Sequence, residues 1–192
     1  MIILAAGNSS RLGKPKQLLN YQGETLLGIV SKAAIETTCE PVVVVLGAYA
    51  QEISANHHHP AIQYVINEHW EKGMSSSIAV GISAVLAQDK DIQQLIIAVS
   101  DQPFISAEVF KTLMSTQSKT NKGIVASSYA NTTGTPVLFY KNYFPKLLSL
   151  QGNEGAKYLL NKYPEDCSSL VFELGDIDID TTSDYDNLNF HR

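Results

Sequence analysis

Short, continuous runs of Val, Ile and Leu alternate along the chain with segments of helical periodicity. Such runs suit strands that are covered on both faces, and their alternation with helices favours a largely parallel sheet. We expect strands at 2–5, 41–46, 62–66, 94–100, 123–128, 136–140 and 170–173. We expect helices at 25–37, 49–55, 76–87, 107–117, 141–150, 154–162 and 182–189. The alternation predicts an α/β fold, in which ligands bind beyond the carboxyl ends of the strands.

Size and charge limit what else the chain can be. Its 192 residues, 44% of them hydrophobic, suffice for one sizeable core, so we expect a single domain over 1–192. A formal net charge of -5 argues against nucleic-acid binding, which normally needs a basic face. No apolar run reaches the roughly 18 residues of a membrane span. Because no secretory signal precedes the first strand and Cys39 and Cys167 lie far apart, we expect a cytoplasmic protein.

The first predicted strand runs into a cationic turn, LAAGNSSRLGKPKQ at 4–17. Gly7 and Gly13 allow a ligand to approach closely, and one arginine and two lysines supply positive charge. A Walker loop is excluded, because five residues separate the glycines and Pro follows the first lysine. The dinucleotide fingerprint GxGxxG is absent as well. The turn therefore indicates a phosphate-binding loop of another kind.

Two further polar turns follow predicted strands. Asp101 comes directly after the strongest apolar run, LIIAV at 95–99, and Pro103 prevents further strand pairing. This carboxylate could share Mg²⁺ with substrate phosphates, although an isolated aspartate in such a place is more often a turn former or helix cap. The second turn, WEKGMSSS at 70–77, leads into a helix whose first amides and hydroxyls can accept an anion or read a base edge.

Five aspartates lie close together in the segment GDIDIDTTSDYDNL at 175–188. An EF-hand is excluded, because counting from Asp176 places Thr181 where the loop needs Gly and Asn187 where it needs Glu. The simplest interpretation is an acidic surface turn with a threonine that caps the last helix. The three adjacent histidines at 57–59 are interpreted as part of a polar loop, because sequence neighbours point in different directions.

The loop matches LAAGxSxRxGxxK at every fixed position. Together with WEKGMSSSI, SDQP, GTPVLF, GNEGAKYLL and DIDTTSDY, it makes the chain resemble the MobA-like nucleotidyltransferases, in their molybdenum cofactor cytidylyltransferase branch. The resemblance implies a single-domain, Rossmann-like three-layer α/β/α fold with a mostly parallel mixed sheet. It implies that Mg²⁺-dependent transfer of CMP from CTP to a phosphorylated acceptor, molybdopterin, releases pyrophosphate. Ala6 favours CTP, because members that use GTP commonly carry LAGG.

The resemblance also assigns roles to residues of this chain. Arg11, Lys16 and Asp101 are expected to be catalytic, and Asp101 and Asp180 to bind the metal, with Asp178 in reserve. The nucleotide is expected to contact Leu4, Ala5, Ala6, Gly7, Ser9, Arg11, Gly13, Lys16, Gly47, Gly73 and Ser77. The acceptor is expected to contact Gln102, Gly134, Thr135, Pro136 and Glu154.

Two alternatives to this activity stay open. One is a nucleotide-dependent carrier or maturation factor that docks onto a molybdoenzyme of the xanthine dehydrogenase type. The other keeps the transfer chemistry but uses a sugar or polyol phosphate as acceptor, or GTP as donor. Thr135 stands where the family often has His, which leaves the acceptor contact at this position open.

Overall fold

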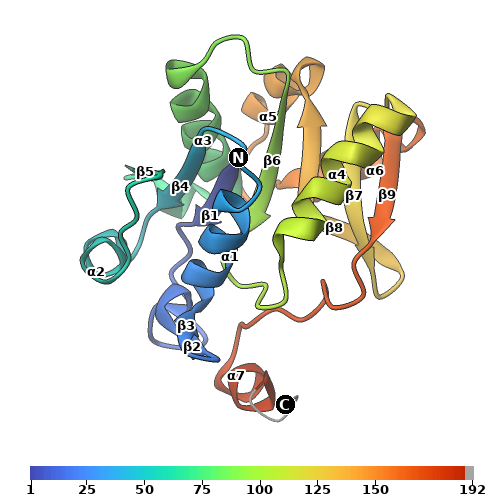
Figure 1. The fold of residues 1–192 in the computed structure, drawn as a ribbon. Helices are drawn as coiled ribbons and strands as arrows, with labels where there is room; N and C mark the ends of the chain where they lie inside the picture. The colour runs from blue at the N-terminus through green and yellow to red at the C-terminus, as the bar shows by residue number, and fades with distance from the viewer. Residues whose placement is uncertain (189–192) are drawn as a thin grey trace.

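The computed structural model describes residues 1–188, and a seven-stranded sheet in the order β5-β4-β1-β6-β8-β7-β9 forms its centre (Figure 1). β8 runs antiparallel to β6 and β7, whereas the other neighbouring strands are parallel. The sheet is therefore mostly parallel but mixed. Its strands are β1 (Ile2–Ala5), β4 (Val42–Leu46), β5 (Ile62–Ile66), β6 (Gln94–Val99), β7 (Ile124–Tyr129), β8 (Thr132–Tyr140) and β9 (Cys167–Val171).

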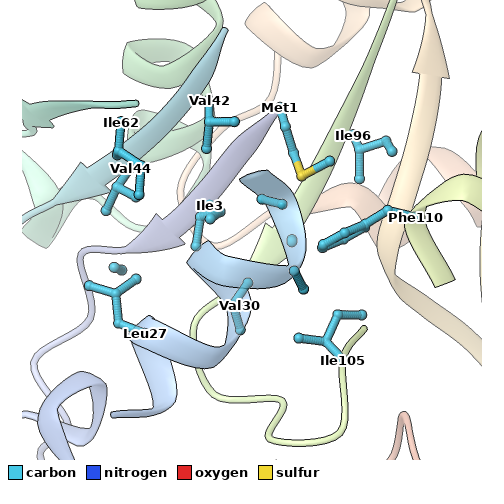
Figure 2. Packing of buried hydrophobic residues seen from close by; sticks show 14 of the residues in the cluster. Met1, Ile3, Leu27, Val30, Val42, Val44, Ile62, Ile96, Ile105 and Phe110 are labelled. Atoms are coloured by element: carbon cyan, nitrogen blue, oxygen red, sulfur yellow. The ribbon is translucent and has the colours of Figure 1, made fainter. Parts of the chain in front are cut away.

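Helices cover both faces of this sheet because the central strands are apolar on both sides. Alternate residues of β1 point to opposite faces: Ile3 packs with α1 and α4, and Ile2 with α3, α5 and α6. Figure 2 shows the first cluster, to which Ile3 of β1, Val30 of α1 and Phe110 of α4 all belong. The helices are α1 (Leu26–Ile35), α2 (Ala50–Asn56), α3 (Met74–Gln88), α4 (Ala107–Thr120), α5 (Phe144–Leu148), α6 (Ala156–Lys162) and α7 (Thr182–Leu188).

A third apolar cluster joins the two ends of the chain beside the main core. The small hairpin of β2 (Asn20–Tyr21) and β3 (Glu24–Thr25) lies near α7 in Figure 1. Tyr21 of the hairpin and Leu188 of α7 share this cluster with Ile179, which is fully buried. The cluster anchors the acidic carboxyl-terminal segment close to the loop that follows β1.

Several predicted boundaries were wrong. The strand expected at 170–173 is β9 (Cys167–Val171), because parallel pairing with β7 recruits polar residues that composition does not mark as a strand. The helix expected at 141–150 divides into a 3₁₀ turn (Lys141–Tyr143) and the short α5. β8 begins four residues before the predicted position 136, and the hairpin of two-residue strands was not predicted at all. Asn189, the predicted end of the last helix, lies outside the described residues.

The interpretation of the three adjacent histidines as part of a loop was confirmed. The chain passes through positions 57–59 as a loop, with His58 stacked on Tyr64 and His59 accepting from the amide of Ala61. Cys39 and Cys167 are free thiols. Within residues 1–188, no helix has both the length and the apolar character needed to cross a membrane.

Candidate active site

A cavity of about 380 Å³ opens at the carboxyl ends of β1 and β6. This volume falls in the range of small-molecule sites, and its position agrees with the rule for ligands of open α/β sheets. Four segments supply its walls: the end of β1 with its loop, the turn before α3 with the start of that helix, the end of β6, and the loop between α5 and α6. The lining residues are Leu4, Ala5, Ala6, Gly7, Asn8, Lys16, Gln17, Trp70, Glu71, Gly73, Met74, Ser77, Val99, Ser100, Asp101 and Asn153.

The loop after β1 is folded by its own polar groups. The carbonyl of Ser9 accepts from the amides of Leu12 and Gly13, and its hydroxyl accepts from the amide of Lys16 at 3.1 Å. Gly13 has φ +68°, a conformation that glycine adopts without strain. Ser9, Arg11 and Gly13 do not line the cavity; Ser9 and Gly13 instead shape the turn that delivers Lys16 to it.

Gln17, which the sequence did not single out, holds the two ends of this loop together. Its side-chain amide donates to the carbonyls of Ala5 at 2.9 Å and Gly7 at 3.2 Å, and the residue is 1% exposed. In a trans peptide the N–H points away from the carbonyl, so these bonds turn the amides of Ala6 and Asn8 to the opposite side. Within residues 1–188, neither amide has a protein acceptor.

Lys16 forms the centre of the charged part of the site. Its ammonium donates to Asp101 Oδ2 at 2.5 Å and to Asp180 Oδ1 at 2.8 Å. Arg11 donates to the other oxygen of Asp180 at 2.5 Å. The side chains of Lys16 and Asp101 are only 15% and 13% exposed, whereas Arg11 is 66% exposed. Three residues that are distant in sequence, Lys16, Asp101 and Asp180, thus form one partly buried ionic network.

The carboxyl-terminal segment is fixed beside Asp101 by its backbone. Ile179 buries its side chain in the third apolar cluster, and its amide lies 3.3 Å from the carbonyl of Asp101. The neighbours Asp178 and Asp180 consequently present oxygen atoms on the same side as Asp101. Asp184 fixes the following turn, because its carboxylate accepts from the amides of Asp180 and Thr181.

Burial and charge act differently on the aspartates. Burial, with the charges of Asp101 and Asp180, raises the pKa of Asp178 above its ordinary value. Burial also acts to raise the pKa of Asp180, but hydrogen bonds and charge from Lys16 and Arg11 lower it overall. Burial acts to lower the pKa of Lys16, and the two carboxylates raise it above its ordinary value. The ionised forms of Lys16 and Asp180 therefore stabilise each other, while ionised Asp178 is disfavoured.

These three aspartates fit a divalent cation. Asp101, Asp178 and Asp180 each offer an oxygen, and the three atoms lie within 4.8 Å of one another. Asp101 Oδ1 is buried and has no hydrogen-bond partner in the described part of the chain, which leaves a ligand atom available. Carboxylate oxygens are the ligands that Mg²⁺ and Mn²⁺ prefer. The structure thus brings together both the predicted metal ligand Asp180 and its reserve, Asp178.

Most of the polar groups in the turn before α3 form hydrogen bonds within the protein. Gly73 has φ +97° and leaves no room for a Cβ beside the carbonyl of Gly152. Ser75 donates to that carbonyl, and Asn67 donates to the hydroxyls of Ser76 and Ser77. Helix α3 already begins at Met74, so the serines lie inside its first turn rather than before it. Ser77 still lines the cavity, as does Asn153, which the sequence did not suggest.

Gly47 does not line the cavity but supports its wall. A Cβ at this position would lie 2.5 Å from the carbonyl oxygen of Ala6 and 2.8 Å from its methyl group. The loop after β4 thus packs directly behind Ala6, whose methyl group occupies the space between this loop and the cavity. A side chain larger than hydrogen at position 47 would push Ala6 into the cavity.

None of the residues predicted to contact the acceptor lines this cavity. Gln102 is 3% exposed, and its amide donates to the carbonyls of Thr135 and Gly175. Gly134 packs against the Tyr129 hydroxyl, and Glu154 accepts from the amide of Gln151. The carbonyl of Pro136 accepts from Ser127. In this structure these five residues make contacts within the fold.

The chain is similar to known proteins along nearly all of its length. Residues 1–167 match the model of the MobA-like NTP transferase domain. The chain belongs to this family. It is 30% identical over 196 residues to the purine catabolism protein PucB of Bacillus subtilis, covering 96% of this chain and 93% of PucB. It is 30% identical to nicotine blue oxidoreductase of Paenarthrobacter nicotinovorans, covering 85% and 81%. Identity to the molybdenum cofactor cytidylyltransferase of Escherichia coli is 25%, covering 73% and 69%.

Solved structures agree with this membership. Rv0371c of Mycobacterium tuberculosis superimposes with a TM-score of 0.86 at 27% identity, covering 97% of this chain and 94% of that chain. Its complex with manganese superimposes with a TM-score of 0.82 at 25% identity, covering 97% and 95%. The three-layer nucleotidyltransferase fold implied by the resemblance is confirmed.

Proposed function

We propose that this protein transfers CMP from CTP to a terminal phosphate of molybdopterin or molybdenum cofactor and releases pyrophosphate. One observation carries the proposal: the cations of the loop after β1 meet the aspartates after β6 and before α7 in a single network beside a cavity of nucleotide size. A protein that only bound nucleotides would not need this set of groups for phosphate and metal. The related cytidylyltransferase of Escherichia coli supports the choice of acceptor.

The reaction needs alignment more than acid or base catalysis. An acceptor phosphate oxygen, already ionised near pH 7, forms a bond to the α-phosphorus, while the bond from that phosphorus to the α–β bridging oxygen breaks. Lys16 and Arg11 donate hydrogen bonds to the phosphates and stabilise the charge that builds on pyrophosphate. The amides of Ala6 and Asn8, oriented by Gln17, offer further donors at the cavity wall.

Asp101, Asp180 and Asp178 would hold the divalent cation, which we propose to be Mg²⁺. When bound, this ion neutralises charge shared by the two reacting phosphates. Asp101 contributes the unpartnered Oδ1, and Asp180 is kept ionised by Lys16 and Arg11. The manganese complex of the related Rv0371c supports a divalent ion in this family.

CTP is favoured over GTP by the methyl group of Ala6. This methyl packs on the loop of Gly47 and borders the cavity, so it reduces the room for a base that stacks there. A pyrimidine ring needs less of this room than a purine. Screening CTP, GTP, ATP and UTP with Mg²⁺ for thermal stabilisation tests the preference, because a ligand that binds the native state raises its apparent stability. A larger shift with GTP would contradict the choice of CTP.

The activity itself is tested by measuring pyrophosphate release from CTP, Mg²⁺ and molybdopterin with purified protein. We expect release without any partner protein. Release that requires a molybdoenzyme, or binding of CTP without turnover, would instead support the alternative of a carrier or maturation factor. Release with a sugar or polyol phosphate but not with molybdopterin would overturn the acceptor.

A further inference from the structure

Lys16 lies against two of the carboxylates that would bind a metal ion. Its ammonium lies between Asp101 Oδ2 and Asp180 Oδ1, at 2.5 and 2.8 Å, and it is largely buried there. It therefore satisfies, with one positive charge, two of the three carboxylates that could hold a divalent ion. The same side chain lines the cavity proposed for the triphosphate. Lys16 thus lies between two potential ligands, the metal and the nucleotide.

We propose that Lys16 is an exchangeable internal cation, which holds the metal-binding carboxylates in the nucleotide-free protein and leaves them when a triphosphate binds. The proposal rests on the proposed function only in taking a triphosphate as the ligand that draws the ammonium away. Its consequence is that nucleotide and divalent metal bind cooperatively, although they contact different groups of the protein.

The ammonium and a divalent ion compete for the same carboxylates through their charge. A metal ion held through the unpartnered Asp101 Oδ1 and an oxygen of Asp180 would share both carboxylates with Lys16, at about 2.0–2.6 Å from its own ligand atoms. Two cations held by the same pair of carboxylates repel each other, and water is largely excluded from this place because Lys16 and Asp101 are mostly buried. Metal binding is therefore disfavoured while the ammonium stays in place.

A triphosphate can replace the hydrogen bonds that the Lys16 ammonium loses when it leaves the carboxylates. Phosphate oxygens accept the same charge-assisted hydrogen bonds as carboxylates. Lys16 follows a loop that carries two glycines, and its backbone amide is held by Ser9, so the long side chain can turn toward the cavity while the backbone stays in place. Arg11 is a poor internal cation, because it is mostly exposed and, within residues 1–188, forms an ion pair with Asp180 but not with Asp101.

The test measures Mn²⁺ binding to the full-length protein without nucleotide, by the electron paramagnetic resonance signal of free Mn²⁺. We expect Lys16→Met and Lys16→Gln to bind Mn²⁺ roughly tenfold more tightly than the natural protein, within the range common for coupled sites. Lys14→Met is the matched control. It removes the same charge two residues away, where the ammonium lies over the Tyr185 ring, and should leave Mn²⁺ affinity nearly unchanged.

A second measurement adds a CTP analogue whose α–β bridging oxygen is replaced by methylene, so that no transfer occurs. Water proton relaxation separates Mn²⁺ in the ternary complex from Mn²⁺ held by the analogue alone. In the natural protein the analogue should tighten Mn²⁺ binding, and in Lys16→Gln this tightening should shrink because the competing cation is already gone. Circular dichroism and thermal unfolding verify that each variant is folded.

Three results would overturn the proposal: no gain of Mn²⁺ affinity in folded Lys16 variants, an equal gain in Lys14→Met, or full tightening by the analogue in Lys16→Gln. These outcomes do not depend on whether the proposed transfer activity is correct. Pyrophosphate release by the natural protein without any change in Mn²⁺ affinity of the variants would refute the exchange alone. Tighter Mn²⁺ binding without transfer from any nucleotide would refute the function alone.

Discussion

The part of the site expected to bind the nucleotide and the part expected to bind the acceptor differ in what their polar groups do. In the first, the amides of Ala6 and Asn8 and Asp101 Oδ1 have no protein partner in the described part of the chain and lie beside a cavity. In the second, the side-chain N–H groups of Gln102 and the carboxylate of Glu154 already bond to backbone groups, although Gln102 Oε1 is also buried without a partner in the described part of the chain; none of the predicted residues lines that cavity. The first region therefore offers a ligand both unpaired polar groups and open space, whereas the second has one unpaired oxygen and no share of that cavity.

The largest effect that would test this difference is expected at Asp101. Asp101→Asn keeps the shape of the side chain but removes the charge that Lys16 and a divalent ion share. We expect pyrophosphate release to fall by about 10²–10³-fold, as for loss of one preorganised electrostatic group, while the protein remains folded. The assay is coupled pyrophosphate detection at saturating CTP and Mg²⁺.

Asp186→Asn is the control for Asp101→Asn. Asp186 belongs to the same acidic run but is exposed on α7 and is not one of the three clustered aspartates. Its substitution should leave turnover near that of the natural protein. Equal losses in the two variants would mean that net charge, not the position of Asp101, governs the reaction.

Gln102 tests the region predicted to bind the acceptor. Gln102→Leu leaves the half-buried carbonyl of Thr135 and the buried carbonyl of Gly175 without their donor, so we expect the free energy of unfolding to drop by about 2 kcal/mol. Urea unfolding measures this loss. Glu154→Gln should be nearly neutral, because its side-chain amide oxygen can still accept from the backbone amide of Gln151. Unchanged stability together with a raised KM for the acceptor would show that Gln102 binds the acceptor instead.

The sequence predicted these two regions with unequal success, for a physical reason. The loop around Lys16 is local, so glycines, cations and spacing within fourteen residues were enough to indicate phosphate binding. Gln17 and Asn67 bond to groups only nine to twelve residues away, but their residue types did not indicate these bonds, and Asn153 lines the cavity from a loop that is distant in sequence. The sheet was predicted where strands were long and apolar, and was misplaced at β9, whose polar residues pair because β7 lies beside them.

Gln17 tests whether the loop amides in the nucleotide-binding region must be held in place. Gln17→Leu removes both bonds that hold the carbonyls of Ala5 and Gly7, and so frees the amides of Ala6 and Asn8 to turn away from the cavity. We expect CTP to bind about tenfold more weakly, which corresponds to the loss of a single net hydrogen bond of about 1.4 kcal/mol. Isothermal titration calorimetry measures the change. An unaltered CTP affinity in a folded variant would show that the loop needs no such clamp.

The smallest effect is expected from Asp178, and it should depend on pH. Its folded-state pKa is raised by burial and by Asp101 and Asp180, so the folded protein holds this proton more tightly than the unfolded chain. Stability is therefore lost as pH rises from the ordinary carboxylate range, near pH 4, through the raised pKa. Asp178→Asn, which resembles the protonated form, should raise the melting temperature slightly at pH 7, and this gain should vanish in acid.

Asp180→Asn should change the melting temperature at pH 7 in the opposite direction from Asp178→Asn. The pKa of Asp180 is lowered overall, because Lys16 and Arg11 outweigh its burial, so its ionised form stabilises the fold above the unfolded-state pKa and loses that effect as pH falls through the folded-state pKa. Its substitution should lower the melting temperature at pH 7, and thermal unfolding from pH 3 to 8 measures both variants. Two losses of equal size at pH 7 would show that Asp178 is as well compensated as Asp180. Opposite signs, with weaker Mn²⁺ binding in both variants, would mean that Asp178 is retained at a cost in stability for the sake of the metal.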